Sequence, residues 1–289
     1  MSSPNFFIVG TPKAGTTSLY YYLEEHPDIF MSPIKETNYF SYAEIKAQQL
    51  YYNEEHISSL GQYLELFKEA KDEKAIGEAS VSYLYYPSVP SKIKEFNSEA
   101  RIIIVLRNPV DRGFSHYLMD RRLGLVDLLY EDIIRKRSAH PKFQLYYQQY
   151  VMLGQYYEQV KRYLTIFGET QVKILLYEDI VSDIESVVKE LFIFLNVDCD
   201  FSPDTNEQHN MYTSPKNFFI QKLYAHKKFR IAAKRFFGEN TQRQIKNVFF
   251  KRDKPELSKK LKHDLSQIYK ENIYKTSELL KRDLTYWLY

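Results

Sequence analysis

The stretch from Phe6 to Leu19 constrains the fold more than any other part of this sequence. It begins with an apolar run typical of a buried strand, breaks at Gly10, and continues through small residues into a helix. In such a loop, successive backbone N–H groups converge on one anion, and the positive end of the helix dipole adds to the attraction. The sequence therefore predicts a phosphate-binding loop, formed by Lys13, Ala14, Gly15, Thr16, Thr17 and Ser18.

The loop follows the P-loop pattern only in part. The spacing from Gly10 to Gly15 matches the first half of G-x-x-x-x-G-K-[ST], but Thr16 stands where that pattern has lysine, and Lys13 lies inside the loop. An ordinary strand, turn and helix capped by Thr16 or Thr17 would have the same sequence without binding any ligand. The loop alone leaves both interpretations open.

A second constraint is the run from Arg101 to Leu106, the clearest strand in the chain. Its continuous apolar character is typical of a strand buried on both faces of a parallel sheet. Arg107 follows directly and can form a forked, always charged contact with a phosphate. Ser115, eight residues further on, can add a hydroxyl hydrogen bond. As ordinary structure, Arg107 would be a charge at a strand end and Ser115 a residue on a helix surface.

Strand and helix signals alternate over the first 200 residues. We expect an α/β fold with a central parallel sheet flanked by helices, and the P-loop-like loop at the carboxyl end of the first strand. A single domain over 1–289 is predicted, with its α/β core at about 5–200 and a basic, mostly helical part at about 215–289. The expected strands are 6–10, 29–31, 74–78, 101–106 and 172–176, and the expected helices are 16–26, 58–71, 87–97, 110–121, 128–137, 155–167, 182–195, 218–237 and 255–282.

Charge is unevenly distributed along the chain. The formal net charge is +3, yet residues 216–262 hold 15 Lys or Arg and only 3 Asp or Glu, so the remainder is acidic. The lone cysteine, Cys199, cannot form an intrachain disulfide and fits a reducing compartment. The start lacks the pattern of a signal peptide, and no window approaches the roughly 20 apolar residues of a membrane span. We therefore expect a cytoplasmic protein.

Three motifs, in order, resemble sulfotransferases that use 3′-phosphoadenosine 5′-phosphosulfate (PAPS). The segment 13–18 resembles their 5′-phosphosulfate loop, and the phrase 101–115 resembles their 3′-phosphate motif, with Arg107 and Ser115 at the matching places. The phrase Lys35-Glu36-Thr37-Asn38-Tyr39-Phe40 resembles the carbohydrate branch, the heparan sulfate-type and related bacterial enzymes, where a glutamate in this phrase is the catalytic base. The resemblance spans most of the chain, through Gly77-Glu78-Ala79-Ser80 to Trp287.

The resemblance implies an enzyme of EC class 2.8.2 that moves the sulfuryl group in line from PAPS to a hydroxyl, or in second place an amine, of a carbohydrate or glycoconjugate. Glu36 would be the general base, and Lys13 would stabilise the leaving phosphate. The donor would be bound by the loop 13–18, Arg107, Ser115 and Lys216, and no metal is expected. An anionic or lipid-linked acceptor and peripheral membrane contact stay open, whereas a nucleic-acid partner is not expected.

The chain departs from the heparan-type pattern at two places. Ala79-Ser80-Val81-Ser82-Tyr83 stands where those enzymes have Lys-Thr-Pro-x-Tyr, so a lysine near the base is absent. Pro215-Lys216-Asn217 replaces their C-terminal Lys-Gly-Arg loop.

Two other functions are alternatives at this point. A P-loop small-molecule kinase or NTPase needs a Lys-Ser/Thr pair closing the loop and an acidic residue to hold Mg²⁺, whereas Arg107 ends the best strand. A nucleic-acid or membrane-surface binding module would use the basic segment 216–262. Within the sulfotransferase hypothesis, His26 and His116 are alternative candidates for the base.

Overall fold

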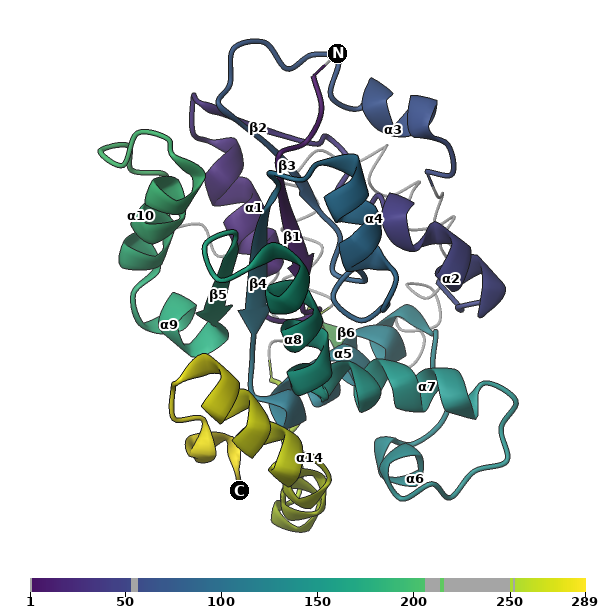
Figure 1. The fold of residues 1–289 in the computed structure, drawn as a ribbon. Coiled ribbons are helices and arrows are strands. Elements are labelled where there is room, and N and C mark those ends of the chain that lie inside the picture. Colours follow the sequence, from purple (N-terminus) through teal and green to yellow (C-terminus); the bar gives the residue numbers. More distant parts are fainter. Residues whose placement is uncertain (1, 53–56, 206–213, 216–249, 252) are drawn as a thin grey trace.

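The computed structural model describes residues 2–52, 57–205, 214–215, 250–251 and 253–289. At its centre lies a five-stranded sheet of order β2-β3-β1-β4-β5, in which every pairing is parallel (Figure 1). The strands are β1 (Phe6–Gly10), β2 (Ile29–Met31), β3 (Ala75–Ala79), β4 (Arg101–Leu106) and β5 (Val172–Leu176). The predicted α/β fold with a central parallel sheet is confirmed.

Helices cover both faces of this sheet. Helices α1 and α10 lie on one face and α4, α5, α8 and α14 on the other (Figure 1). Their apolar residues belong to the two clusters that cover these faces. The helices are α1 (Thr16–Glu24), α2 (Tyr42–Ala47), α3 (Leu60–Glu65), α4 (Val89–Phe96), α5 (Pro109–Leu123), α6 (Tyr130–Ile134), α7 (Phe143–Tyr150), α8 (Tyr156–Phe167), α9 (Tyr177–Ser182), α10 (Ile184–Leu195) and α14 (Lys259–Leu280). Short 3₁₀ turns lie at η1 (Tyr39–Ser41), η2 (Met152–Gly154) and η3 (Thr285–Trp287), and β6 (Ser214–Pro215) pairs antiparallel with β7 (Phe250–Lys251).

The strand order creates a switch point between β1 and β4. After β1 the chain adds β2 and β3 on one side, and then crosses to β4 and β5 on the other. The helices that follow β1 and β4, α1 and α5, therefore leave toward opposite faces. In parallel α/β sheets, ligands bind where such connections diverge, at the carboxyl ends of the strands.

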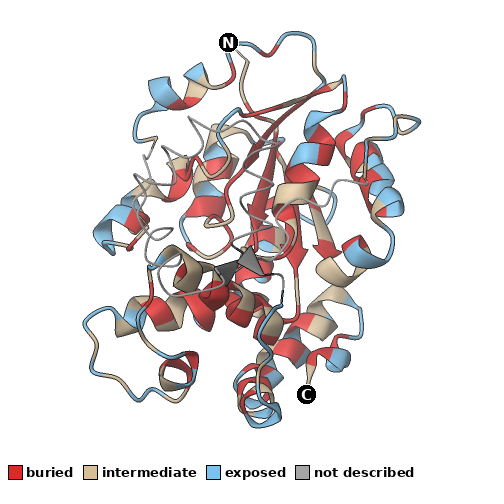
Figure 2. Ribbon diagram, turned by 180° about the vertical axis from the view of Figure 1, so that it is seen from behind, coloured by how far each residue is buried: buried red, intermediate tan, exposed pale blue. Residues whose placement is uncertain are grey.

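Strand β4 shows why the sheet is buried on both sides. Ile102 and Ile104 belong to one apolar cluster and Ile103 and Val105 to the other, and all four are fully buried. Figure 2 shows the central strands in the colour of buried residues. Successive side chains of a strand alternate between faces, so an uninterrupted apolar run requires two covering layers.

Some predicted helices differ from the structure. The helix expected at 58–71 is confined to α3, because the N–H groups of Phe67 and Ala70 bond three residues back and tighten the chain into turns. Helix α7 was not predicted. The helix predicted at 218–237 lies outside the described residues.

The C-terminal elements α14 and η3 pack at the end of the molecule where α5 lies. Helix α14 packs against α8 and α5, and Trp287, only 1 % exposed, follows it in η3 (Figure 1). The indole N–H of Trp287 donates to Glu178 at 3.1 Å, and its carbonyl oxygen accepts from the Asn108 amide at 3.2 Å. The C-terminus thus fixes the turn that follows β4. Among the described residues, no helix is long and apolar enough to cross a membrane.

Candidate active site

The predicted phosphate loop connects β1 to α1. Gly15, the residue before the helix, has φ 87°, and a Cβ there would lie 3.3 Å from the Tyr177 ring. This left-handed backbone and close approach explain why glycine stands at this position. No side chain of the described residues caps α1, and no acidic residue lies in its first turn, so its N-terminal end is suited to an anion.

Arg107 joins the two predicted donor-binding stretches. Its guanidinium donates a 2.8 Å hydrogen bond to the carbonyl oxygen of Lys13 and lies over the Tyr177 ring, 4.3 Å from its centroid. The Tyr156 hydroxyl donates to the carbonyl of Arg107 at 2.8 Å. Ser115 lies in α5, the helix that starts just after Arg107, at intermediate burial.

The side chain of Lys13 lies near other cations, Arg122, Arg107 and Lys35. Its ammonium is 3.7 Å from the Met119 sulfur. Burial, and then the charges of Arg122 and Arg107, lower the pKa of Lys13 to about 8. A cluster of positive charges at a helix N-terminus is the electrostatic pattern of an anion site.

Hydrogen bonds with the backbone of Ala79 and Val81 hold Glu36 at the carboxyl end of β3. Its N–H donates to the Ala79 carbonyl at 2.8 Å, and one carboxylate oxygen accepts from the Val81 N–H at 2.9 Å. The other oxygen forms an ion pair with Lys35, and the side chain is 26 % exposed. Glu36 adopts φ 65°, a left-handed conformation that is strained for a non-glycine residue. The Glu36 carboxylate therefore has a fixed orientation and is accessible to solvent.

A buried carboxylate, Glu78, supports the Glu36 loop from beneath. It is fully buried on β3, and burial raises its pKa. It accepts hydrogen bonds from the hydroxyls of Thr37 (2.6 Å), Ser80 (2.5 Å), Tyr63 (2.7 Å) and Tyr83 (3.1 Å). Glu78 was not among the predicted site residues. A glutamate inside an otherwise small and apolar strand was the available signal.

The two histidines considered as alternative bases are held in other contacts. His26 bonds the Asp198 carbonyl at 2.8 Å and packs 4.5 Å from the Phe192 ring, so it closes the end of α1. His116 is buried 2.7 Å from the Tyr52 hydroxyl. Burial, with the Arg112 and Lys13 charges, holds the pKa of His116 well below its usual range. A neutral histidine with a depressed pKa is a weak proton acceptor.

Other features lie elsewhere or outside the described part. Lys216, predicted to bind the donor, is not among the described residues.

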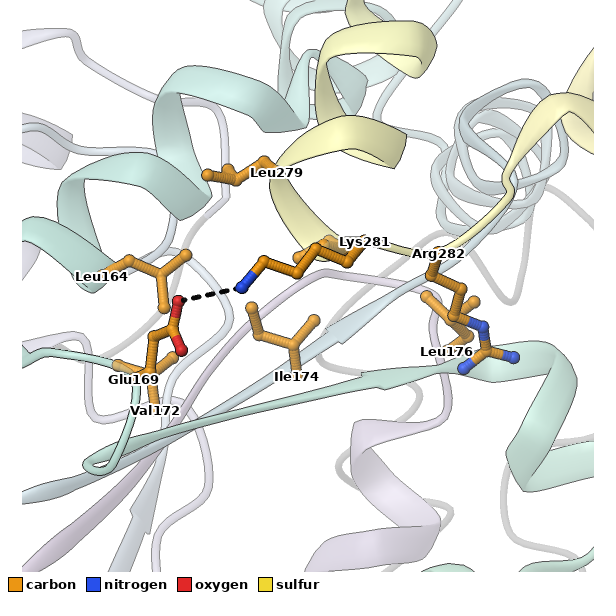
Figure 3. A pocket seen from close by; sticks show the side chains of 9 residues that line it. Leu164, Glu169, Val172, Ile174, Leu176, Leu279, Lys281 and Arg282 are labelled. Carbon is orange, nitrogen blue, oxygen red and sulfur yellow. Dashed lines mark ion pairs between the residues drawn. The ribbon is translucent and has the colours of Figure 1, made fainter.

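A hollow of about 220 Å³ lies at the edge of the sheet, where Lys281 pairs with Glu169 at 3.9 Å (Figure 3). It contains none of the predicted site residues. Its lining is Leu164, Glu169, Val172, Ile174, Leu176, Leu279, Leu280, Lys281 and Arg282.

Fold and candidate site together describe a parallel α/β protein with a glycine-containing loop between β1 and α1, at the carboxyl end of the sheet. Residues 3–277 match the sulfotransferase domain family, and the chain belongs to this family. The predicted family is thereby confirmed.

Solved and characterised relatives agree with this assignment. The crystal structure of a sulfotransferase from Alicyclobacillus acidocaldarius is 31 % identical, with a TM-score of 0.74 over 99 % of both chains. The chain is also similar, at 26 % identity each, to the membrane-associated sulfotransferase kil1 of Dictyostelium discoideum (75 % of this chain, 62 % of that protein) and to carbohydrate sulfotransferase 15 of Mus musculus (67 % and 44 %). A mouse bifunctional heparan sulfate N-deacetylase/N-sulfotransferase 4 is likewise 26 % identical over 76 % of this chain and 25 % of its own length. The chain thus spans less than two thirds of these three relatives.

Proposed function

We propose that this protein transfers the sulfuryl group of PAPS to a hydroxyl of a carbohydrate or glycoconjugate. One observation carries the proposal: the segments bearing Lys13, Arg107 and Glu36 meet at the carboxyl ends of three adjacent strands. The 2.8 Å hydrogen bond from Arg107 ties the loop after β4 to the loop after β1. The N–H of Ser80 donates to Ile8 at 3.1 Å, which ties the segment after β3, and with it Glu36, to the same edge.

The residues fit a donor with two separate phosphate groups. The loop 13–18 and the start of α1 would hold the 5′-phosphosulfate, while Arg107 and Ser115 would hold the 3′-phosphate. When bound, PAPS supplies the sulfuryl group and a leaving phosphate on which charge grows. Lys13 would stabilise that growing charge, so it contributes to turnover as well as to binding.

Glu36 would accept the proton of the acceptor hydroxyl. As the acceptor oxygen bonds to sulfur, the bond from sulfur to the 5′-phosphate oxygen breaks and the proton passes to the carboxylate. The Val81 N–H and the Lys35 ammonium orient that carboxylate. In-line transfer of this kind depends mainly on positioning and electrostatics, by analogy with phosphoryl transfer.

The carbohydrate acceptor is supported by the names of two relatives, a carbohydrate sulfotransferase and a heparan sulfate N-deacetylase/N-sulfotransferase. The kinase and NTPase alternative is not favoured, because the chain belongs to the sulfotransferase domain family. The lone Cys199 supports a cytoplasmic location as part of the proposal.

A panel of glycans and small metabolites, incubated with isotopically labelled PAPS and analysed by mass, tests the acceptor. We expect a sulfated carbohydrate hydroxyl. Sulfated amines or phenols with no carbohydrate product would overturn the acceptor class.

Thermal shift tests the donor: adenosine 3′,5′-bisphosphate should stabilise the protein without metal. Stabilisation by ATP with Mg²⁺ instead would overturn the donor assignment.

A further inference from the structure

Two buried tyrosines of helix α8 contact two different segments of the candidate site. Tyr156 and Tyr163 are seven residues apart, which is two turns of helix, so they lie on the same face of α8 as Val160. All three side chains are buried. Two turns separate the tyrosines by about 10 Å along the helix axis, and their hydroxyls reach segments that follow different strands.

The hydroxyl of Tyr156 holds the segment after β4. It donates at 2.8 Å to the carbonyl oxygen of Arg107, which lies one residue beyond the end of β4. A buried carbonyl oxygen needs a hydrogen-bond donor, and outside a strand that donor must come from another part of the chain. Because the carbonyl belongs to Arg107 itself, this bond fixes the backbone from which the guanidinium extends to the Lys13 carbonyl.

The hydroxyl of Tyr163 holds the segment between β3 and α4. It donates at 2.9 Å to the carbonyl oxygen of Tyr83. The hydroxyl of Tyr83 in turn lies 3.2 Å from the Thr37 hydroxyl and accepts the Phe40 N–H at 3.3 Å. Thr37 directly follows the proposed base, so this chain of contacts connects α8 to the segment that carries Glu36.

A third side chain of α8 contacts the segment between β3 and α4. The guanidinium of Arg162 donates at 3.0 Å to the carbonyl oxygen of Tyr85, two residues after Tyr83. Tyr163 and Arg162 thus hold the segment beside the proposed base, whereas Tyr156 holds the segment of the proposed donor site.

We propose that Tyr156 and Tyr163 are positioning residues, the first for the donor and the second for the base. Tyr156 orients Arg107. Tyr163 acts through Tyr83 on the segment that carries Glu36. The proposal rests on the proposed roles of Arg107 and Glu36. In-line transfer requires the donor and the base to be aligned to within about 1 Å, and one helix that holds both segments keeps them aligned.

The test compares Tyr156→Phe with Tyr163→Phe. Each substitution removes one hydroxyl from the same helix face and leaves one backbone carbonyl without that donor, so both should lower the free energy of unfolding to a similar extent. Donor affinity is measured by calorimetry with adenosine 3′,5′-bisphosphate. Turnover is measured as single-turnover transfer from isotopically labelled PAPS, at saturating concentration, to the glycan panel described above.

The two variants should differ in what they impair. For Tyr156→Phe we expect the dissociation constant of adenosine 3′,5′-bisphosphate to rise about 3- to 10-fold, with little change in transfer at saturating PAPS. For Tyr163→Phe we expect an unchanged dissociation constant and transfer about 10- to 100-fold slower, because the base is misplaced. Hydroxyls that are merely structural would lower stability without this division. Equal changes in both variants, or changes in stability alone, would therefore overturn the proposal.

Tyr157→Phe is the matched control on the same helix. The Tyr157 ring lies beneath the ammonium groups of Lys161 and Lys275, at 5.4 and 5.9 Å. Loss of its hydroxyl should change neither donor affinity nor transfer.

Arg162→Met decides the question if a phenylalanine variant fails to fold. It removes the donor to the Tyr85 carbonyl, so transfer should fall while the dissociation constant stays unchanged. Weakened donor binding with normal transfer would contradict the proposal. A wild-type protein that does not bind adenosine 3′,5′-bisphosphate, or that sulfates no glycan, would instead overturn the proposed function, and so the two failures are distinguishable.

Discussion

The guanidinium of Arg107 donates a 2.8 Å hydrogen bond to the carbonyl oxygen of Lys13, across 94 residues of sequence. This contact joins the loops that follow the two central strands, β1 and β4. It uses one nitrogen of the Arg107 guanidinium, and the planar cation lies over the Tyr177 ring at the carboxyl end of β4. Arg107 therefore shapes the loop after β1, and in the proposed donor site it would contribute positive charge.

Arg107→Ala should weaken binding of adenosine 3′,5′-bisphosphate by about 10- to 150-fold, the loss expected for a charge-assisted hydrogen bond. Ser115→Ala should cost less, about 2- to 10-fold. Turnover at saturating donor should change little, because a 3′-phosphate remote from sulfur contributes binding rather than chemistry. Calorimetry and saturation kinetics measure both. Arg101→Ala, at the opposite end of β4, is the matched control, and unchanged affinity in Arg107→Ala would contradict the assignment.

Glu36→Gln should lower single-turnover sulfuryl transfer to an alcohol acceptor by about 10²- to 10⁴-fold, because glutamine keeps the shape but cannot take a proton. Donor affinity, set by other residues, should stay nearly unchanged. His116→Ala, assayed with the same acceptor, is the comparison. Near-normal transfer in the glutamine variant with collapse in the alanine variant would make His116 the base.

Glu78→Gln should lower the free energy of unfolding at pH 7 by about 1–3 kcal/mol, because an amide nitrogen would face hydroxyls that now donate to a carboxylate. Transfer should fall as well, since the Thr37 and Ser80 hydroxyls that hold the Glu36 loop depend on it. Chemical denaturation and turnover measure the two effects. Glu95→Gln, on the exposed side of α4, is the control and should change neither.

The difference in stability between the wild type and Glu78→Gln should depend on pH. Burial raises the pKa of Glu78 above its ordinary value of 4.5, so the folded protein holds this proton more tightly than the unfolded chain. The resulting stabilisation is complete below pH 4.5 and is lost as the pH rises through the raised value. The difference in Tm between wild type and Glu78→Gln should therefore shrink as the pH increases above 4.5. A difference that grows with pH would contradict the direction of the shift.

Trp287→Ala should lower the free energy of unfolding by about 3–5 kcal/mol, because a fully buried aromatic ring is lost. It should also weaken binding of adenosine 3′,5′-bisphosphate, since the lost indole N–H donates to the same Glu178 oxygen that accepts from the Asn108 N–H beside Arg107. Tyr286→Ala is the control: this neighbour is 51 % exposed and should change stability by no more than about 0.5 kcal/mol. Full donor affinity in a folded Trp287→Ala protein would contradict the effect of Trp287 on donor binding.

The local elements of this protein follow from its sequence. A short run of apolar residues fixes β4, and Gly15 with the small residues around it fixes the loop and the start of α1, because burial and backbone freedom act on neighbouring residues. The predicted sites at Lys13, Glu36, Arg107 and Ser115 came from such local patterns and from their resemblance to one family. Helix 58–71 was overestimated for the same reason: periodicity alone does not say where packing of Phe67 tightens the chain into turns.

Only the tertiary structure decided which distant residues meet in the interior around the candidate site. Asp120 meets Tyr51 and Tyr150 from positions 69 and 30 residues away, and Glu78 meets Thr37 from 41 residues away. No local periodicity encodes these pairs, because they depend on the order in which parallel strands assemble and on which helices cover each face. Their energies arise from burial, which does not exist until the sheet has formed.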